Sequence, residues 1–305
     1  MTVFQASGKL LLFGEYLVLR GTSCLALPLR FGQKMTVEKS NFDGILWESF
    51  ALNQLWFSVR FSNDLTIFES SDLEKASIIQ KLLMQIQTLN PTVELRNIHF
   101  IFEADFDRNF GFGTSSTLIS LLSQWAKVNP YLLLENSFGG SGYDIAAATV
   151  SLPFVYTVRD KITQSFALPT AITDKLLFVY LGEKQQSSRE ISKFKTKQTT
   201  DNQLVEMNNI VEQASVCQSI ETWENLIDQS ENLLSEILEM PKVKDLYFSD
   251  YPHAIKSLGA WGGDFVMATC RDIKTAKDYF QQHGKNVVFE YDELVFKAWF
   301  STHEY

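Results

Sequence analysis

The stretch of residues 109–117, which reads NFGFGTSST, joins a strand-like run to a helical run. Gly111 and Gly113 permit positive φ angles and a close approach of the backbone. The amides that follow are the unpaired donors of a helix N-terminus, and they lie at the positive end of its dipole. This arrangement favours a phosphate-bearing ligand. A hydroxyl residue that only caps a helix after a glycine turn would give the same pattern, so the stretch alone leaves both interpretations open.

Two familiar phosphate motifs do not fit this stretch. A P-loop requires G-x-x-x-x-G-K-[ST], and no lysine follows these glycines. A dinucleotide fingerprint requires a third glycine at the position of Ser116. The hydroxyls of Thr114, Ser115 and Ser116 add hydrogen-bond donors and a candidate metal ligand. The sequence therefore indicates a glycine and hydroxyl turn of a different type.

Composition excludes several classes of partner. The chain has 305 residues, 45% hydrophobic and 21% charged, as in folded globular proteins. Its net charge of -9 argues against nucleic acid and anionic membranes. The N-terminus lacks a signal-peptide pattern, and nowhere do about eighteen apolar residues run together without a charge. The three cysteines show no metal or disulfide spacing. We expect a cytoplasmic protein with no nucleic-acid or membrane partner, either a monomer or a homodimer.

Hydrophobic periodicity predicts an α+β fold, because strands and helices alternate irregularly and the early strands are closely spaced. In the first half we expect strands over residues 9–13, 16–19, 34–38 and 97–104 and helices over residues 72–89 and 117–127. In the second half we expect strands over residues 175–181, 265–270 and 286–290, a helix over residues 273–282, and two long helices that carry Leu204, Met207, Val211 and Ala214, and Trp223, Leu226, Leu233 and Ile237. Pro169 and Thr170 mark a boundary, which predicts domains over residues 1–168 and 169–305.

Two further motifs lie far from the glycine turn. Residues 7–16 read SGKLLLFGEY, with a lysine at the start of a strand and Gly-Glu at its turn. Residues 259–264 read GAWGGD, where three glycines suggest backbone held close to a ligand or to another segment. Alone, the first is compatible with an ordinary exposed strand start and the second with a flexible loop.

Together the three motifs resemble those of the GHMP kinases, the family of galactokinase, homoserine kinase, mevalonate kinase and phosphomevalonate kinase. The first matches the family's G-K-x-x-L-x-G-E, residues 111–116 its G-L-G-S-S-A phosphate loop, and residues 259–263 its C-terminal glycine loop. The segment GGSGYDIAAA at residues 139–148 is similar to the S-G-x-D segment of mevalonate and phosphomevalonate kinases. The resemblance implies the two-domain fold of the family, with an N-terminal ribosomal-protein-S5-like β/α domain and a C-terminal ferredoxin-like α/β sandwich.

The resemblance also implies ATP and Mg2+ as cofactors. The residues that would hold the ATP phosphates are Gly111, Phe112, Gly113, Thr114, Ser115 and Ser116. Ser115 would also reach Mg2+, together with Glu135, which stands near the family's metal-binding glutamate. Without the resemblance, Glu135 would be a solvated loop carboxylate.

The resemblance implies that Asp144 accepts or orients the proton of the attacking hydroxyl and that Lys9 neutralises charge on the transferring group. Asp144 alone would be an N-cap for a helix that begins at Ile145. The residues that the resemblance places at the small-molecule substrate are Glu15, Tyr16, Gly142, Lys184, Ser188, Arg189, Gly262 and Gly263.

The implied activity is ATP-dependent phosphorylation of mevalonate or 5-phosphomevalonate. A sugar or homoserine kinase of the same family and a catalytically silent nucleotide-binding module are the alternatives. The sequence departs from the family at Ser7, where proline is usual, and at Tyr16, where mevalonate kinases carry histidine. Trp261 replaces a glycine and Asp264 is added, which concerns the acceptor more than the catalytic residues.

Overall fold

The structure, a computed structural model, describes residues 1–182, 192–259, 261 and 263–295. The described chain forms two compact units. The first comprises Met1–Gly8, Phe31–Arg108 and Phe112–Thr149, and the second comprises Lys9–Arg30, Asn109–Gly111 and the chain from Val150 onward. Two long strands, β1 (Thr2–Phe13) and β2 (Ser23–Lys39), contribute residues to both units. The division of the chain into domains at residues 168 and 169 stays a prediction.

The first unit contains a mixed sheet. Its strands are β5 (Ile67–Ser70), β4 (Gln54–Phe61), β3 (Ile45–Ala51), β6 (Ile98–Ala104) and β2, in that spatial order, and β1 also pairs with β2. Strands β3 and β6 run parallel, whereas β4 is antiparallel to both of its neighbours and β2 is antiparallel to β6. Together with the helices described below, this sheet confirms the α+β expectation.

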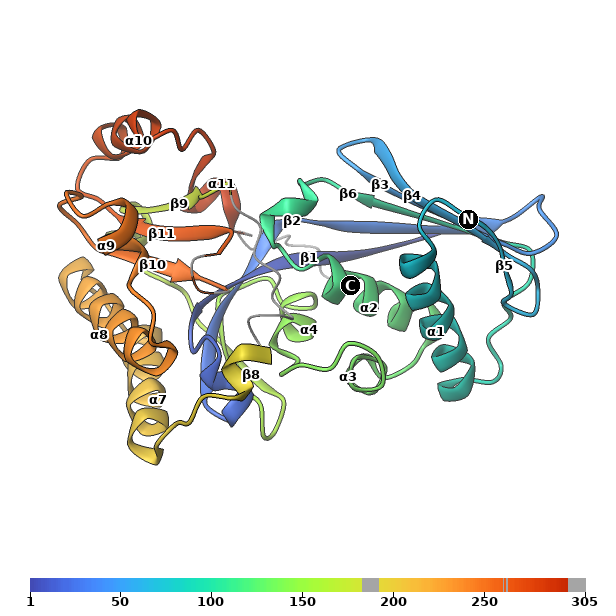
Figure 1. The fold of residues 1–305 in the computed structure, drawn as a ribbon, viewed down its shortest axis with the longest axis horizontal. Helices are drawn as coiled ribbons and strands as arrows, with labels where there is room; N and C mark the ends of the chain where they lie inside the picture. Colours follow the sequence, from blue (N-terminus) through green and yellow to red (C-terminus); the bar gives the residue numbers. More distant parts are fainter. Residues whose placement is uncertain (183–191, 260, 262, 296–305) are drawn as a thin grey trace, which may run out of the picture. The chain divides into compact units, whose positions relative to one another are not determined.

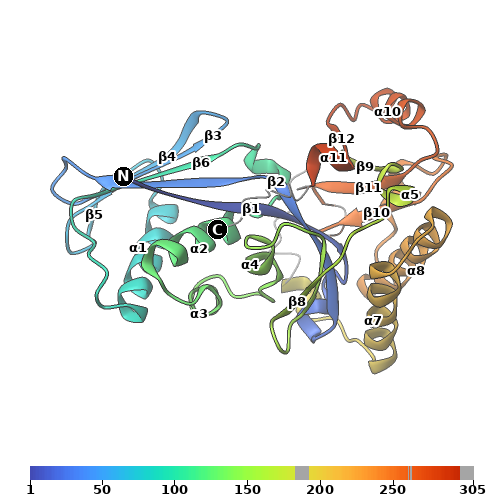
Figure 2. The same cartoon turned by 180° about the vertical axis from the view of Figure 1, so that it is seen from behind.

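Helices α1 (Leu73–Leu89) and α2 (Thr114–Ala126) lie on the same face of this sheet (Figures 1 and 2). Shorter helices follow, namely α3 (Pro130–Glu135) and α4 (Tyr143–Ala147), and the 3-10 turn η2 (Arg108–Phe110) precedes α2. The core between sheet and helices is aromatic: the Trp47 ring stacks on Phe102 at 4.4 Å, and Phe100 meets Trp125 edge-on at 4.9 Å. Trp47 and Phe100 are almost fully buried.

Two local features depart from the sequence expectations. The hairpin of β3 and β4 was not expected, and its turn places Leu52 and Asn53 at φ 48° and 63°. Positive φ at both central residues is usual for a tight hairpin, and Asn-Gly is the dipeptide that usually indicates one. This turn has Leu52 and Asn53 instead, so its sequence does not indicate a hairpin. The strand expected over residues 16–19 is wrong, because the chain there forms the 3-10 turn η1 (Leu17–Arg20).

The second unit contains an antiparallel sheet of strands β10 (Ile255–Leu258), β11 (Phe265–Thr269), β9 (Leu176–Tyr180) and β12 (Val288–Glu290), in that spatial order. Strand β7 (Phe154–Thr157) does not belong to this sheet but pairs with the first residues of β2, and β8 (Ile162–Ser165) pairs with β7. The helices of this unit are α5 (Thr170–Thr173), α7 (Asp201–Ser215), α8 (Ile220–Leu238), α9 (Val243–Tyr247), α10 (Ile273–Gln282) and α11 (Tyr291–Leu294), and the unit also holds η1.

Helices α10 and α8 cover opposite faces of the four-stranded sheet (Figure 1). Phe280 of α10 packs in one core cluster with Ile255 of β10. The next residue of that strand, Lys256, points to the other face, because side chains alternate along a strand, and there it contacts Glu231 of α8. None of the helices within the described residues combines the length and the apolar character that a membrane span requires.

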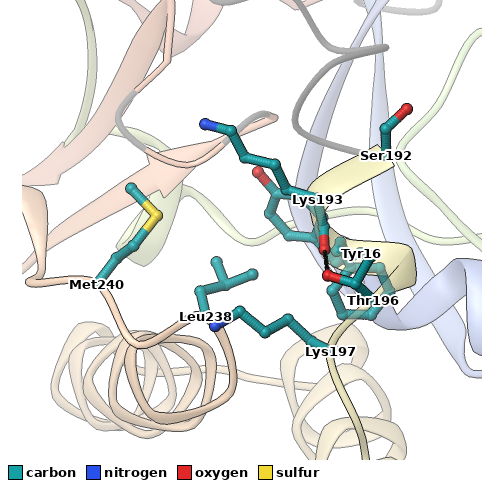
Figure 3. A pocket seen from close by; sticks show the side chains of 8 residues that line it. Tyr16, Ser192, Lys193, Thr196, Lys197, Leu238 and Met240 are labelled. Carbon is teal, nitrogen blue, oxygen red and sulfur yellow. Dashed lines mark hydrogen bonds between the residues drawn. The ribbon is translucent and has the colours of Figure 1, made fainter.

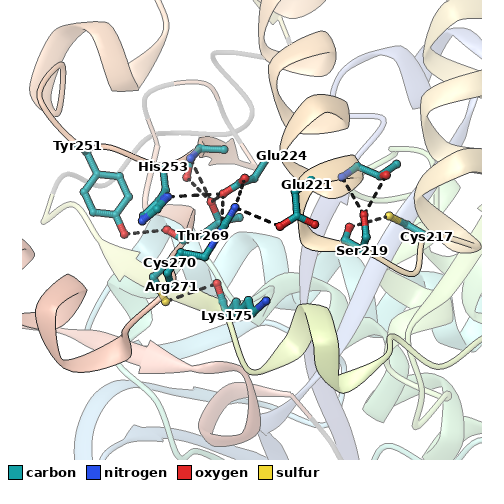
Figure 4. A network of polar contacts seen from close by, with 12 residues as sticks. Lys175, Cys217, Ser219, Glu221, Glu224, Tyr251, His253, Thr269, Cys270 and Arg271 are labelled. Carbon is teal, nitrogen blue, oxygen red and sulfur yellow. Dashed lines mark hydrogen bonds and ion pairs between the residues drawn. The ribbon is translucent and has the colours of Figure 1, made fainter.

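A polar network fixes α8 to the sheet (Figure 4). The Glu224 carboxylate accepts two hydrogen bonds from the Arg271 guanidinium, at 2.9 and 2.7 Å, and a third from the Thr269 hydroxyl at 2.6 Å. Burial by itself would raise the pKa of Glu224, but these hydrogen bonds outweigh it, and the net result is a lowered pKa. The carboxylate therefore stays ionised and acts as a structural anchor.

A second network is buried completely. The Lys256 ammonium, with a side chain 0% exposed, donates to Glu15 Oε1 at 2.6 Å and lies 3.5 Å from Glu231 Oε1. The Glu231 carboxylate in turn accepts from the backbone and hydroxyl of Ser257, at 3.1 and 3.3 Å. Because one lysine stands between two buried carboxyl groups, full ionisation of both would leave an uncompensated charge in the core. Burial accordingly raises the pKa of Glu15 and raises the pKa of Glu231 to about 7.

The aromatic core of the first unit gives a stability prediction. Phe100→Ala removes a ring that is 0% exposed, and we expect it to lower the free energy of unfolding by about 3–5 kcal/mol. Phe68→Ala makes the same change at a ring that is 73% exposed and should cost less than about 1 kcal/mol. Urea unfolding followed by tryptophan fluorescence measures both. Equal losses would show that Phe100 does not support the core.

The buried carboxyl of Glu231 gives a pH prediction. Its folded-state pKa of about 7 lies above the ordinary value of 4.5, so the folded protein binds the additional proton between these pH values. Stability from this group is therefore present below pH 4.5 and is lost as the pH rises through 7. We expect Glu231→Gln to remove a decline on the order of 1–3 kcal/mol between pH 5 and 7.5 in urea unfolding. Asp228→Asn, an exposed change on the same helix, should leave the decline in place.

Candidate active site

The glycine turn before α2 adopts the conformation that its sequence indicated. Gly113 is the N-cap of α2 and lies in the left-handed region, at φ 93° and ψ 44°. No side chain caps this helix end. The amides of Thr114, Ser115 and Ser116 occupy the first turn, where no earlier helical carbonyl can accept their hydrogen bonds. The start of α2 therefore presents backbone donors at the positive end of the helix dipole.

The hydroxyls of this turn divide into two groups. The Ser116 hydroxyl donates to the Gly113 carbonyl at 2.8 Å, and the Thr117 hydroxyl donates to Gln33 Oε1 at 2.7 Å, so both are used within the fold. Ser115 is exposed, and its hydroxyl forms no hydrogen bond with the residues that the structure describes. Among the serines of the turn, Ser115 is thus the one that can offer oxygen to a ligand or to Mg2+.

The backbone of strand β1 supports the turn from behind. A Cβ atom at Gly8 would lie 2.9 Å from the carbonyl oxygen of Phe112 and 3.0 Å from that of Phe31, closer than real side chains approach. The Phe112 ring is fully buried and contacts Phe31 and Phe106, with ring centroids 5.9 and 5.6 Å apart. Phe112 therefore anchors the loop in the core, between two glycines that are only partly buried.

Lys9 and Asp264 both lie at Gly111 in the second unit. The Lys9 ammonium donates to the Gly111 carbonyl at 3.0 Å. A Cβ atom at Gly111, where φ is 67°, would come within 2.0 Å of Asp264 Oδ2. Sequence reasoning noted Asp264 only as an addition to the C-terminal glycine loop. The structure brings together Lys9, Gly111 and this loop, three segments that are far apart in the sequence.

Asp144 and Glu135 lie in the first unit. Asp144 is half-buried in the first turn of α4, which begins after Gly142 at φ 86°, and its Oδ1 accepts from the Ile145 amide at 3.1 Å. Glu135 is the last residue of α3 and is exposed. Both α3 and α4 pack against α2. Within the described ranges, no three His, Cys, Asp or Glu side chains are grouped to hold a metal ion by themselves. A Mg2+ ion at Ser115 and Glu135 would need further oxygens from phosphate and water, as is usual for this ion.

Glu15 and Tyr16 occupy the turn after β1. The Glu15 side chain is buried against Lys256, as described above. Tyr16 has φ 60° and ψ -49°, and the Leu17 amide donates to the Glu15 carbonyl at 2.6 Å, which forms a γ-turn of the strained kind. Such backbone costs on the order of 1–3 kcal/mol, and it persists only where neighbouring structure fixes it. The Tyr16 hydroxyl accepts from the Trp261 amide at 2.7 Å.

A cavity of about 650 Å³ lies beside Tyr16 in the second unit (Figure 3). Leu238 and Met240 line one side, and Tyr16 and Lys193 line the other. The remaining lining residues are Ser192, Phe194, Thr196 and Lys197. An apolar wall with hydroxyls and ammonium groups suits a small polar molecule. Lys193 was not expected, because nothing in its surroundings in the sequence distinguishes it from a surface lysine.

The other substrate candidates are only partly described. Lys184, Ser188, Arg189 and Gly262 lie outside the residues that the structure describes. Gly142 and Gly263 are buried. The substrate-binding roles of all these residues stay predictions.

No family profile and no curated protein sequence matches the chain. Solved structures do match. A mevalonate kinase from Methanococcus jannaschii aligns with a TM-score of 0.69 at 15% identity, over 97% of this chain and 98% of that chain. A Streptococcus pneumoniae phosphomevalonate kinase in complex with phosphomevalonate and AMPPNP gives 0.68 at 18% identity, over 95% and 99%.

A galactokinase from Lactococcus lactis, complexed with galactose, aligns with a TM-score of 0.69 at 10% identity, over 92% of this chain and 89% of that chain. The three kinases phosphorylate different acceptors, as their names state, but they share this fold over nearly their whole length. Identities this low establish the fold alone. The chain therefore has the fold of the GHMP kinases, which confirms the resemblance of its motifs at the level of the fold.

Proposed function

We propose that this protein is an ATP-dependent kinase that phosphorylates a small-molecule acceptor. The observation that carries the proposal is the glycine and hydroxyl turn at the start of α2, with its free helix end and the exposed Ser115, in a chain that has the fold of small-molecule kinases. Phosphoryl transfer requires alignment and charge compensation more than covalent chemistry from the protein. Backbone amides, a metal ion and a few cations can supply these even in an acidic protein.

The nucleotide is ATP in this proposal, and residues 111–116 hold its phosphates. Ser115 and Glu135 contribute oxygens to Mg2+, which neutralises charge on the phosphates when it is bound. The phosphomevalonate kinase of similar fold was solved with AMPPNP, which supports a nucleotide triphosphate as the ligand class. Ser116 and Thr117 hold the loop in shape through their hydrogen bonds.

Asp144 accepts or orients the proton of the acceptor hydroxyl, and Lys9 compensates charge on the transferring group. The partly buried position of Asp144 in the first turn of α4 supports a held carboxylate, and the hydrogen bond from Lys9 to Gly111 ties its ammonium to the phosphate loop. The cavity at Tyr16 receives the acceptor in this proposal. The substrate-binding roles of Gly142, Gly263, Lys184, Ser188, Arg189 and Gly262 rest on the resemblance of their motifs alone.

Mevalonate or 5-phosphomevalonate is the acceptor that we propose. The Ser-Gly-Tyr-Asp form of residues 141–144 and the similarity to mevalonate and phosphomevalonate kinases support this choice. Lys193 in the cavity wall favours an anionic acceptor over a neutral one, whereas Lys197 pairs with Glu239 at 2.6 Å. A sugar kinase is the second candidate, because the galactokinase is equally similar in fold.

The acceptor is tested with a panel of mevalonate, 5-phosphomevalonate, galactose and homoserine, each incubated with ATP and Mg2+. We expect ADP release with mevalonate or 5-phosphomevalonate and none after chelation of the metal. Release with galactose alone would favour the sugar kinase. Release with no member of the panel, combined with measurable ATP binding, would favour a silent nucleotide-binding module.

Asp144→Asn tests the proton acceptor. The substitution keeps the shape of the side chain and removes its charge, so kcat should fall about 10²–10⁴-fold while the Kd for ATP changes little. Steady-state ADP release and calorimetric titration with ATP measure the two quantities. Asp160→Asn, at an exposed site, is the matched control and should leave both unchanged. Unchanged kcat in Asp144→Asn would remove this residue from the mechanism.

Ser115→Ala tests the exposed hydroxyl of the phosphate loop. We expect the KM for MgATP to rise about tenfold, because one oxygen near the metal is lost, while the melting temperature stays the same. Ser115→Thr retains the hydroxyl and should restore most of the activity. An unchanged KM for MgATP in Ser115→Ala would place the metal elsewhere.

A further inference from the structure

One segment of the second unit contacts two neighbouring residues of the turn after β1. Lys256 binds the Glu15 carboxylate, and the Trp261 amide, five residues farther along the chain, binds the Tyr16 hydroxyl. We propose that Lys256 and Glu15 are a positioning pair, which holds Tyr16 in the wall of the acceptor cavity and at the backbone of residue 261. This inference rests on the proposed function, in which the cavity receives the acceptor.

The turn requires an external hold. At φ 60° and ψ -49°, Tyr16 adopts backbone that a side chain with a Cβ atom disfavours, and the short bond from the Leu17 amide to the Glu15 carbonyl closes the γ-turn around it. Without further contacts, the turn would relax to a common conformation and the ring would turn away. The strain therefore indicates that surrounding groups determine where Tyr16 lies.

The buried ion pair can supply this hold. The side chains of Lys256 and Glu15 are 0% and 3% exposed, so no bulk water competes for their hydrogen bond of 2.6 Å. Glu231 lies 3.5 Å from the same ammonium and binds the backbone amide of Ser257, which fixes the lysine within β10. In such a low-dielectric site a hydrogen-bonded charge pair is strong and directional, and separating its members leaves a buried charge uncompensated.

Tyr16 links the ion pair to the cavity. The Tyr16 ring packs on Phe194, with centroids 5.2 Å apart, and both residues line the cavity. Glu15 and Lys256 are not among the lining residues, although Glu15 is adjacent to Tyr16 in sequence. A change at the ion pair should therefore alter binding of the acceptor without direct loss of a contact to it, and should leave the nucleotide loop unaffected.

Glu15→Gln is the first test. The amide oxygen can still accept from Lys256, and Lys256 keeps Glu231 as an ionic partner, so the variant should fold. We expect the KM for the acceptor to rise about tenfold, with kcat and the KM for ATP changed less than about twofold. Glu69→Gln, which removes the acidic partner of the exposed Arg60–Glu69 pair, is the control and should change neither KM. Should Glu15→Gln fail to fold, Glu15→Asp replaces it with the same expected result. The aspartate side chain is one methylene shorter, so its carboxylate lies farther from Lys256.

A double-mutant cycle separates positioning from general destabilisation. Tyr16→Ala removes the ring through which Glu15 acts, so adding Glu15→Gln to Tyr16→Ala should raise the KM for the acceptor less than about twofold further. Full additivity of the two effects would overturn the proposal. So would a Glu15→Gln enzyme that loses kcat at an unchanged KM for the acceptor, since that is the result of less folded enzyme.

A spectroscopic measurement makes the inference independent of turnover. Trp261 is 3% exposed, and its emission is isolated from that of the other five tryptophans by subtracting the spectrum of the same protein with Trp261→Phe. We expect Glu15→Gln and Tyr16→Phe to shift this emission to the red, and Glu69→Gln to leave it unchanged. If the wild-type enzyme phosphorylates no acceptor of the panel, the proposed function fails. The Trp261 emission then tests by itself whether Lys256 and Glu15 hold Tyr16 in place. An unshifted Trp261 emission in Glu15→Gln would overturn it.

Discussion

The ammonium group of Lys256 has no contact with solvent, and the arrangement of the second unit follows from how it is compensated. A lone charge in this position would cost several kcal/mol, so the fold must bring carboxylates to it. Glu15 comes from the turn after β1 and Glu231 from α8, while the lysine belongs to β10. One buried cation thereby fixes a helix, a strand and a turn against one another.

Much of the architecture could be predicted, because helices and strands that pack in the core have a regular spacing of apolar residues along the sequence. The helix expected over residues 273–282 matches α10, and the helix expected over residues 72–89 differs from α1 by one residue at its start. The hairpin of β3 and β4 could not be predicted from turn chemistry, since Leu52 adopts a φ angle that usually requires glycine or asparagine. The 3-10 turn at residues 17–20 was missed because its apolar side chains are also compatible with a strand.

The candidate site was predictable only where the chemistry is local. The glycine turn before α2 and the helix after Gly142 have sequence signals, because left-handed backbone and a helix N-terminus both limit residue choice. Long-range pairs have no such signal. Glu15 and Lys256 are 241 residues apart, and a lysine between Ile255 and Ser257 resembles one on the exposed face of a strand. The motif at residues 7–16 predicted that Glu15 lies at the substrate. The burial of its side chain depends on the contact with Lys256, which the sequence does not indicate.

The hydrogen bond that reaches the Tyr16 hydroxyl begins at the main chain of residue 261 and not at its indole ring. Every amino acid except proline has that N–H group, so the contact does not constrain which side chain stands there. The indole has a separate contact, because its Nε1 donates to the Pro241 carbonyl at 3.0 Å in a side chain that is 3% exposed. The main chain of residue 261 thus holds the tyrosine while its side chain packs elsewhere, so a smaller residue there would lose the packing and keep the hold.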